Sequence, residues 1–186
     1  MVCDVFIVKG SSAKLTIKGD GTILADPSAD ALVGVDENNL SVCVLSALDG
    51  AYVAIQGGTY HSTGCTTIFA RTNSHVIIED GKFIADDPEY TLDILESEMD
   101  ESNYSFISVF GGEFVKFNPE NHSNDGGYSS KVVSFTSHVI YDESTQTYSV
   151  EFHNVIYAES VLGELNMLAY CDVCGFHIDY KADLEH

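Results

Sequence analysis

Basic side chains are scarce in this sequence. Its 186 residues include 8 lysines and arginines against 29 aspartates and glutamates, so the formal net charge is −21 at pH 7. Nucleic-acid binding depends on many contacts between basic side chains and phosphates, and so few cations exclude that function. The same deficit disfavours attachment to an anionic membrane surface. We therefore expect neither a nucleic acid nor a membrane as a partner.

Long hydrophobic runs and secretion signals are also missing. No stretch approaches the roughly 18 uninterrupted apolar residues that a transmembrane helix needs. The opening MVCDVFIVKG lacks the basic start and long apolar core of a signal peptide. The final LEH (residues 184–186) resembles the start of a vector-derived histidine tag. We expect a chain made in the cytoplasm without a signal peptide, and we set residues 184–186 aside.

Cysteine is infrequent, and its number is odd. The five cysteines follow no regular spacing, which favours thiols in a reducing cytosol over a disulfide framework. They are Cys3, Cys43, Cys65, Cys171 and Cys174.

What the sequence does contain is a repeat. YVAIQGGTYHS begins at Tyr52, HVIIEDGKFIAD at His75 and FISVFGGEFVKF at Phe106, and a weaker copy, KLTIKGDGTILAD, begins at Lys14. Each copy alternates apolar and polar residues, reaches a glycine, and continues as a short strand with an aromatic or aliphatic anchor. Alternation of this kind is typical of strands with one buried side. The repeats therefore predict stacked β units of about 20–25 residues with loop insertions.

The glycines predict how these units stack. Glycine adopts positive φ at low cost, so a glycine after an inward strand allows the chain to bend. The aromatic residue after each bend would then point back into the core. The predicted turn glycines are Gly58, Gly81 and Gly112, and the aromatics are Tyr60, Phe83 and Phe114. Ordinary hairpin turns remain the alternative, but the repeated register favours an all-β fold, a right-handed parallel β-helix (solenoid), over residues 1–152. Strands bearing Ile55, Ile78 and Val109 should then run parallel.

The end of the chain departs from the repeat. SHVIYDESTQTYSVEF (Ser137–Phe152) predicts a hairpin, and YAESVLGELNMLAY (Tyr157–Tyr170) predicts a short helix. The hairpin and the helix are the candidate C-terminal cap of the solenoid, whose end strands need covering. We expect residues 153–183 to form a cap and oligomerisation segment that holds a homotrimer. Its interface residues would be Val161, Leu162, Leu165 and Leu168.

A family resemblance adds to this interpretation. FISVFGGEFVKFNPENHSNDGG followed by SHVIYDESTQTYSVEF resembles the end of a repeat region, of GGTF…FNP type, in Bacteroides and gut-phage proteins. The resemblance covers residues 52–152, is sharpest over Gly111–Asn121, and ends after Phe152. It implies a right-handed parallel β-helix and a place in a phage particle, as a fibre, spike or head decoration. It also implies a homotrimer.

Residues for catalysis are sparse. β-Helices often cleave polysaccharides, which requires carboxylates placed to act as acid and base. The only pair of adjacent aspartates is Asp86 and Asp87, which precede a proline and fit a solvated turn better. Arg71, the sole arginine, has no aspartate-rich motif beside it for lyase chemistry. We expect no enzymatic activity.

Binding groups are equally few. CDVCGFH places Cys171, Cys174 and His177 at the spacing of zinc ligands, with His153 or Cys65 as a fourth ligand only through folding. Small core or interface cysteines explain this pattern better, so we expect no metal and no cofactor. Tyrosines in polar loops are candidates for stacking on a sugar. They are Tyr90, Tyr104 and Tyr128.

The sequence thus favours a non-enzymatic structural or adhesion protein of a phage virion, with other virion proteins or a surface glycan as partners. The alternative is a carbohydrate-active or carbohydrate-binding β-helix protein of a bacterial surface. The missing signal peptide and catalytic set count against it.

Overall fold

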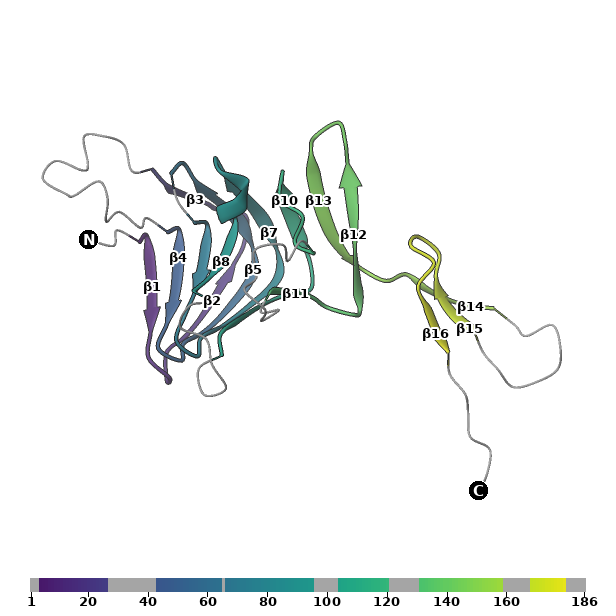
Figure 1. Ribbon diagram of the computed structural model, residues 1–186, viewed down its shortest axis with the longest axis horizontal. Helices are drawn as coiled ribbons and strands as arrows, with labels where there is room; N and C mark the ends of the chain where they lie inside the picture. Colours follow the sequence, from purple (N-terminus) through teal and green to yellow (C-terminus); the bar gives the residue numbers. More distant parts are fainter. Residues whose placement is uncertain are drawn as a thin grey trace, which may run out of the picture. The chain divides into compact units, whose positions relative to one another are not determined.

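The computed structural model describes residues 4–26, 43–64, 66–95, 104–120, 131–158 and 168–179 (Figure 1). Regular structure in these ranges is almost entirely β, as predicted, with one short 3-10 helix at Pro88–Tyr90. No helix within them is long and apolar enough to cross a membrane. The chain forms two compact units, Met1–Glu151 (unit 1) and Phe152–His186 (unit 2).

Three sheets contain the strands. The first has the order β1-β4-β6-β8. It comprises β1 (Phe6–Lys9), β4 (Leu45–Leu48), β6 (Ile68–Ala70) and β8 (Leu92–Ile94). The second comprises β2 (Lys14–Lys18), β3 (Thr22–Ala25), β5 (Tyr52–Ser62), β7 (His75–Ala85), β9 (Phe106–Val109), β10 (Gly112–Val115), β11 (Lys131–Val133), β12 (Ser137–Asp142) and β13 (Thr147–Phe152). The third comprises β14 (Val155–Ala158), β15 (Leu168–Cys171) and β16 (His177–Asp179).

Within unit 1 the chain alternates between the first two sheets. β1 is followed by β2 and β3, β4 by β5, β6 by β7, and β8 by β9 and β10. Successive strands of each sheet pair in parallel, β1 with β4, β4 with β6 and β6 with β8 in one sheet. In the other sheet β5 pairs in parallel with β2, β3 and β7. Each passage of the chain therefore adds one layer, here called a coil, to both sheets.

The core consists of columns of equivalent residues from successive coils. Ile17 pairs with Ile55, Ile55 with Ile78, and Ile78 with Val109. Ile55, Ile78 and Val109 are fully buried. The predicted parallel pairing of these strands is confirmed. Residues alternate between the two faces of a strand, so the same positions point inward in every coil.

Aromatic side chains form a second buried column. Tyr60, Phe83 and Phe114 have no exposed surface. The ring centroids of Tyr60 and Phe83 are 5.2 Å apart, and those of Phe83 and Phe114 are 5.0 Å apart, in stacked geometry. The Tyr60 hydroxyl donates to the carbonyl oxygen of Gly57 at 2.9 Å, which satisfies its buried polar group. Burial raises the pKa of Tyr60 to about 12.

Glycines permit the close approach of successive coils. Gly58, Gly81 and Gly112 have φ of +93°, +134° and +111°, in the range that favours glycine. A Cβ on Gly112 would lie 2.9 Å from the Gly81 carbonyl oxygen, and one on Gly81 would lie 3.3 Å from that of Gly58. The bends do not end the strands, however, because β5 and β7 continue through them with a register shift between Ile55 and Thr59. Gly58 and Gly81 thus act as bulges inside continuous strands, whereas Gly112 begins β10, a strand separate from β9.

Antiparallel pairing enters where the repeat ends. β13 pairs with β10 in antiparallel register, and β12 lies beyond β13 in the same sheet. The turn between β12 and β13 is held by Asp142, whose carboxylate accepts hydrogen bonds from Ser144 and Thr145. The predicted hairpin is present, and the second sheet is therefore mixed rather than wholly parallel.

Unit 2 contradicts the predicted helix. Residues 157–158 belong to β14 and residues 168–170 to β15, which pair in antiparallel register. The prediction of a helix over Tyr157–Tyr170 is therefore wrong at both ends. The helical periodicity of so short a segment is weak, and pairing between strands outweighs it. The expected interface residues Val161, Leu162 and Leu165 lie outside the described residues, and Leu168 belongs to β15.

Candidate functional site

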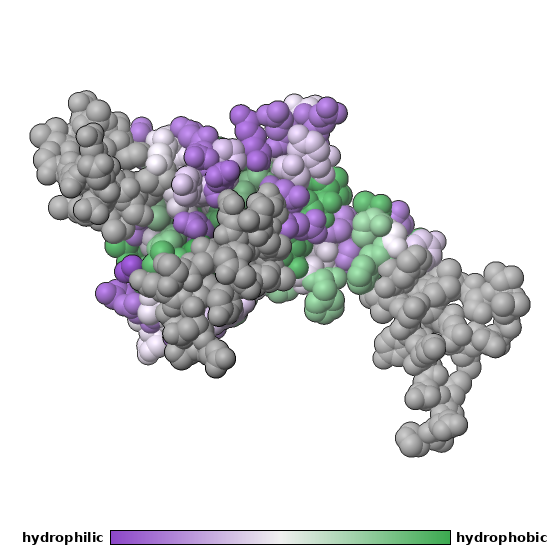
Figure 2. Space-filling model, in the orientation of Figure 1, coloured by the Kyte–Doolittle hydropathy of each residue, from purple (hydrophilic) through white to green (hydrophobic). Residues whose placement is uncertain are grey.

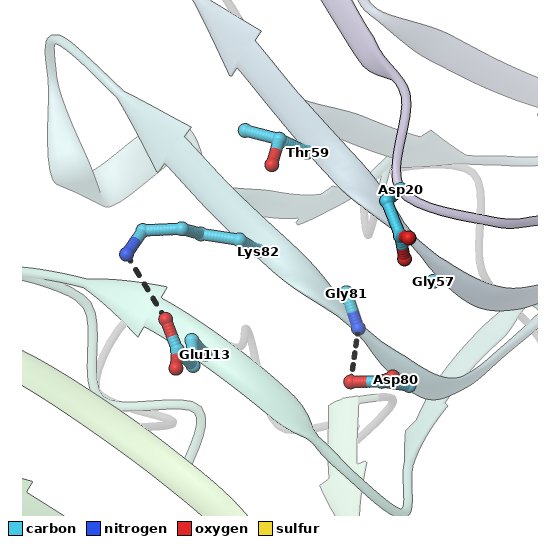
Figure 3. Close-up of a pocket in the computed structure, with 8 residues that line it drawn as sticks. Asp20, Gly57, Thr59, Asp80, Gly81, Lys82 and Glu113 are labelled. Carbon is cyan, nitrogen blue, oxygen red and sulfur yellow. Dashed lines mark hydrogen bonds and ion pairs between the residues drawn. The ribbon is translucent and has the colours of Figure 1, made fainter.

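An open groove crosses the bends of unit 1 (Figure 3). It encloses about 250 Å³. Its lining combines the bend glycines with polar residues beside them, namely Asp20, Gly57, Gly58, Thr59, Asp80, Gly81, Lys82 and Glu113. Thr59 pairs with Lys82 and Lys82 with Glu113, so the residue after each bend contributes to one surface column.

The lining of this groove carries three carboxylates and one lysine, and one ion pair joins two of these groups. Lys82 Nζ lies 3.0 Å from Glu113 Oε2, and the two side chains point toward one another in Figure 3. Asp80 Oδ1 accepts from the backbone N–H of Gly81 at 2.8 Å. The groove therefore offers hydrogen-bonding groups and more carboxylates than cations.

The adjacent aspartates occupy a solvated turn, as expected from the proline that follows. Asp86 and Asp87 are both exposed. Asp87 caps the 3-10 helix by accepting from the Glu89 N–H at 3.3 Å, whereas Asp86 accepts from His61 Nε2 at 3.4 Å. The two carboxylates therefore have separate partners and separate structural roles.

The sugar-binding candidates do not gather at the groove. Tyr90 lies in the 3-10 helix and is 48% exposed, and Tyr104 is 39% exposed. Neither lines the groove, and Tyr128 lies outside the described residues. Arg71, the lyase candidate, is partly buried and its backbone N–H donates to Ser74 Oγ at 3.0 Å.

A cluster of metal-ligating atoms lies in unit 2. The Sγ atoms of Cys171 and Cys174 and a ring nitrogen of His153 all lie within 4.8 Å of one another. Cys174 Sγ is 3.4 Å from His153 Nδ1. Cys43, Cys171 and Cys174, the cysteines that the structure describes, form no disulfide. We call these three side chains, His153, Cys171 and Cys174, the thiol–imidazole cluster.

The turn between β15 and β16 positions the two thiols. The Cys171 carbonyl accepts from the Gly175 N–H at 2.9 Å, and the Phe176 carbonyl accepts from the Cys171 N–H at 2.9 Å. Gly175 has φ of +73°, a conformation that favours glycine, although a Cβ there would meet no other atom within 4 Å. This closed turn places Cys171 at its start and Cys174 just before the glycine.

His153 is fixed from two directions. Its ring stacks on Phe176 with centroids 4.8 Å apart and planes 3° from parallel. The next residue, Asn154, is tied to Asp172 by a side-chain hydrogen bond of 2.8 Å and by a backbone bond of 3.3 Å. The chain before β14 is therefore held beside the cysteine turn.

The environment of Cys171 favours the thiolate. Burial would by itself raise the pKa of this thiol. Hydrogen bonds to its sulfur from the backbone N–H groups of Cys174 and Val173, with further contributions from the side chains of His153 and Cys174, act in the opposite direction. Together they lower the pKa of Cys171 from 9.0 to about 6. Thiolates are the form that binds metals.

The sequence predicted part of the thiol–imidazole cluster but not the groove. The cysteine spacing identified Cys171 and Cys174, whereas His153 was only an optional partner, because 21 residues separate it from Cys174. His177, the third expected ligand, lies in β16 opposite Tyr170. Cys65 lies outside the described residues. The groove was missed, although the polar residue after each repeated glycine was a usable signal.

The geometry therefore provides two candidate sites, an acidic groove on unit 1 and the thiol–imidazole cluster of unit 2. Comparison of the chain with protein-family models, curated proteins and solved structures finds no match.

Proposed function

We propose that the chain is a non-enzymatic structural or adhesion component of a phage particle, built as a right-handed parallel β-helix with the β12–β13 hairpin as its cap. The observation that carries this proposal is the in-register stacking of unit 1. Four successive coils alternate between two sheets, and the same positions meet in each coil. Ladders of backbone hydrogen bonds along such a stack give a stiff rod, which suits a fibre or spike.

The handedness and the cap follow from general rules. A connection that leaves one strand, crosses a second layer and returns to a parallel neighbour is right-handed in about 98% of cases. An open end of a stack exposes unpaired strand edges and invites association. Antiparallel β13 covers the edge of β10, so the hairpin closes that part of the last coil.

Self-association as a homotrimer is part of the proposal. Unit 2 exposes Val155, Ile156, Val173 and Phe176 among its described residues. Figure 2 also shows exposed hydrophobic residues between hydrophilic regions on the visible face. With a net charge of −21, copies of the chain repel one another at low salt. Association therefore needs the burial of apolar surface, which stabilises a complex by roughly 25 cal/mol per Å².

The proposal predicts that phage particles contain this chain. Gradient-purified particles from the phage that encodes this chain should contain its peptides in mass spectrometry, and antibodies against the chain should label intact particles. The purified chain should release neither reducing ends nor unsaturated products from polyuronates and capsule polysaccharides. Light scattering after size exclusion should give the mass of a trimer in moderate salt.

Three outcomes would overturn parts of this account. Absence of the chain from particles would contradict the virion assignment. Glycan cleavage that is lost in Asp86→Asn or Asp87→Asn would favour a carbohydrate-active protein instead. A monomer at tens of micromolar would refute the trimer.

A further inference from the structure

We propose that unit 2 binds one Zn²⁺ ion through Cys171 Sγ, Cys174 Sγ and His153 Nδ1. Sulfur and imidazole nitrogen are ligands that select zinc over magnesium and calcium, which prefer oxygen. Three protein ligands leave a fourth tetrahedral position, which water occupies where no side chain does. The site is separate from the acidic groove and independent of the proposed virion role.

The distances fit a tetrahedral ion. With Zn–S near 2.3 Å and Zn–N near 2.0–2.1 Å, tetrahedral angles place a sulfur and a nitrogen about 3.6 Å apart and two sulfurs about 3.8 Å apart. Cys174 Sγ and His153 Nδ1 are 3.4 Å apart, and no pair in the cluster exceeds 4.8 Å. Changes of about 1 Å or less in these separations would therefore complete the coordination.

The surroundings of the ligands are already arranged. Backbone N–H groups of Val173 and Cys174 donate hydrogen bonds to Cys171 Sγ and so hold this sulfur in place. The Phe176 ring orients the imidazole of His153. Ligand-orienting groups of this kind lower the cost of ordering a metal site.

Unit 2 also needs stabilisation beyond its core. Among its residues whose side chains the structure describes, only Cys171 is buried. Folded units below about 40 residues usually need disulfides, metals or oligomerisation. The two described thiols of unit 2 form no disulfide, so a metal ion that joins the cysteine turn to the segment before β14 would supply this cross-link.

Cobalt(II) titration of the full chain tests the site. The protein is purified without a polyhistidine tag, reduced, and stripped with a chelator. We expect the absorption of tetrahedral cobalt with thiolate charge transfer, saturating at one ion per chain and abolished by added Zn²⁺. Cys171→Ser and Cys174→Ser should remove the charge-transfer band or weaken affinity at least tenfold, and His153→Ala should weaken affinity by a similar factor.

His61→Ala is the matched control, because His61 is an imidazole of unit 1 with an aspartate neighbour. It should bind cobalt as the unmodified chain does. Far-ultraviolet circular dichroism of Cys174→Ser, at an exposed position, checks that the fold of unit 1 persists. A spectrum of hydrated octahedral cobalt with the unmodified chain would overturn the proposal. So would a tetrahedral spectrum that survives replacement of both cysteines, or a Cys171–Cys174 disulfide that forms in place of metal binding.

Discussion

Replacement of Phe83 by alanine is expected to lower the free energy of unfolding of unit 1 by about 3–5 kcal/mol. Phe83 is fully buried and is the middle ring of the Tyr60–Phe83–Phe114 column. Its removal leaves a cavity and breaks two stacking contacts, each worth about 0.5–1.5 kcal/mol beyond the buried area. Equilibrium unfolding in urea should show a lower midpoint with an unchanged slope.

Phe135→Ala is the matched control. This phenylalanine is 82% exposed, so its loss should change stability by no more than about 0.5 kcal/mol. If Phe83→Ala does not fold, Phe83→Leu still removes the stacking while retaining much of the volume, and it should be intermediate. A Phe83→Ala protein as stable as the Phe135→Ala protein would contradict the aromatic column.

A methyl group on Gly111 is expected to destabilise unit 1 by about 1–3 kcal/mol or more. In Gly111→Ala the new Cβ would meet the carbonyl oxygen of Glu79 in the preceding coil, closer than any real contact allows. The backbone must therefore move, and the ladder between β7 and the last coil should weaken. Thermal unfolding measures the effect, because each kcal/mol shifts the midpoint by about 2–4 °C in a chain of this size.

Gly21→Ala is the control for that substitution. No atom lies within 4 Å of a Cβ at Gly21, and its φ is not in the left-handed range. Reduced freedom of the unfolded chain should make it neutral or stabilising by about 0.4–1 kcal/mol. Equal destabilisation by both substitutions would show that coil spacing does not depend on Gly111.

The repeat made much of unit 1 predictable. In each repeat, apolar and polar residues alternate, the strand bends at a glycine, and an aromatic residue follows. This pattern predicts that Tyr60, Phe83 and Phe114 point into the core, and the structure buries all three. The continuity of β5 through its glycines was not predictable, because a glycine signals a bend without saying whether hydrogen bonding resumes beyond it.

Unit 2 was harder to predict for a physical reason. Val155 and Ile156 favour a strand, whereas apolar residues spaced three and four apart between Val161 and Leu168 favour a helix. A short segment cannot decide between the two without its partners. β14 and β15 are strands because they pair with each other. The same pairing positions His153 near Cys174, and no local pattern contains that information.

Cysteine cross-linking tests the stacking of coils most directly. Thr59 and Lys82 face each other in neighbouring coils, and Lys82 faces Glu113 in the next. The pair Thr59→Cys and Lys82→Cys lies within the Cα separation of about 4.4–6.8 Å that a disulfide needs. The pair Thr59→Cys and Glu113→Cys is two coils apart, about 9.6 Å at the usual strand spacing. Peptide mapping after mild oxidation should find the first disulfide and not the second; a 59–113 disulfide, or no 59–82 disulfide, would contradict the stacked coils.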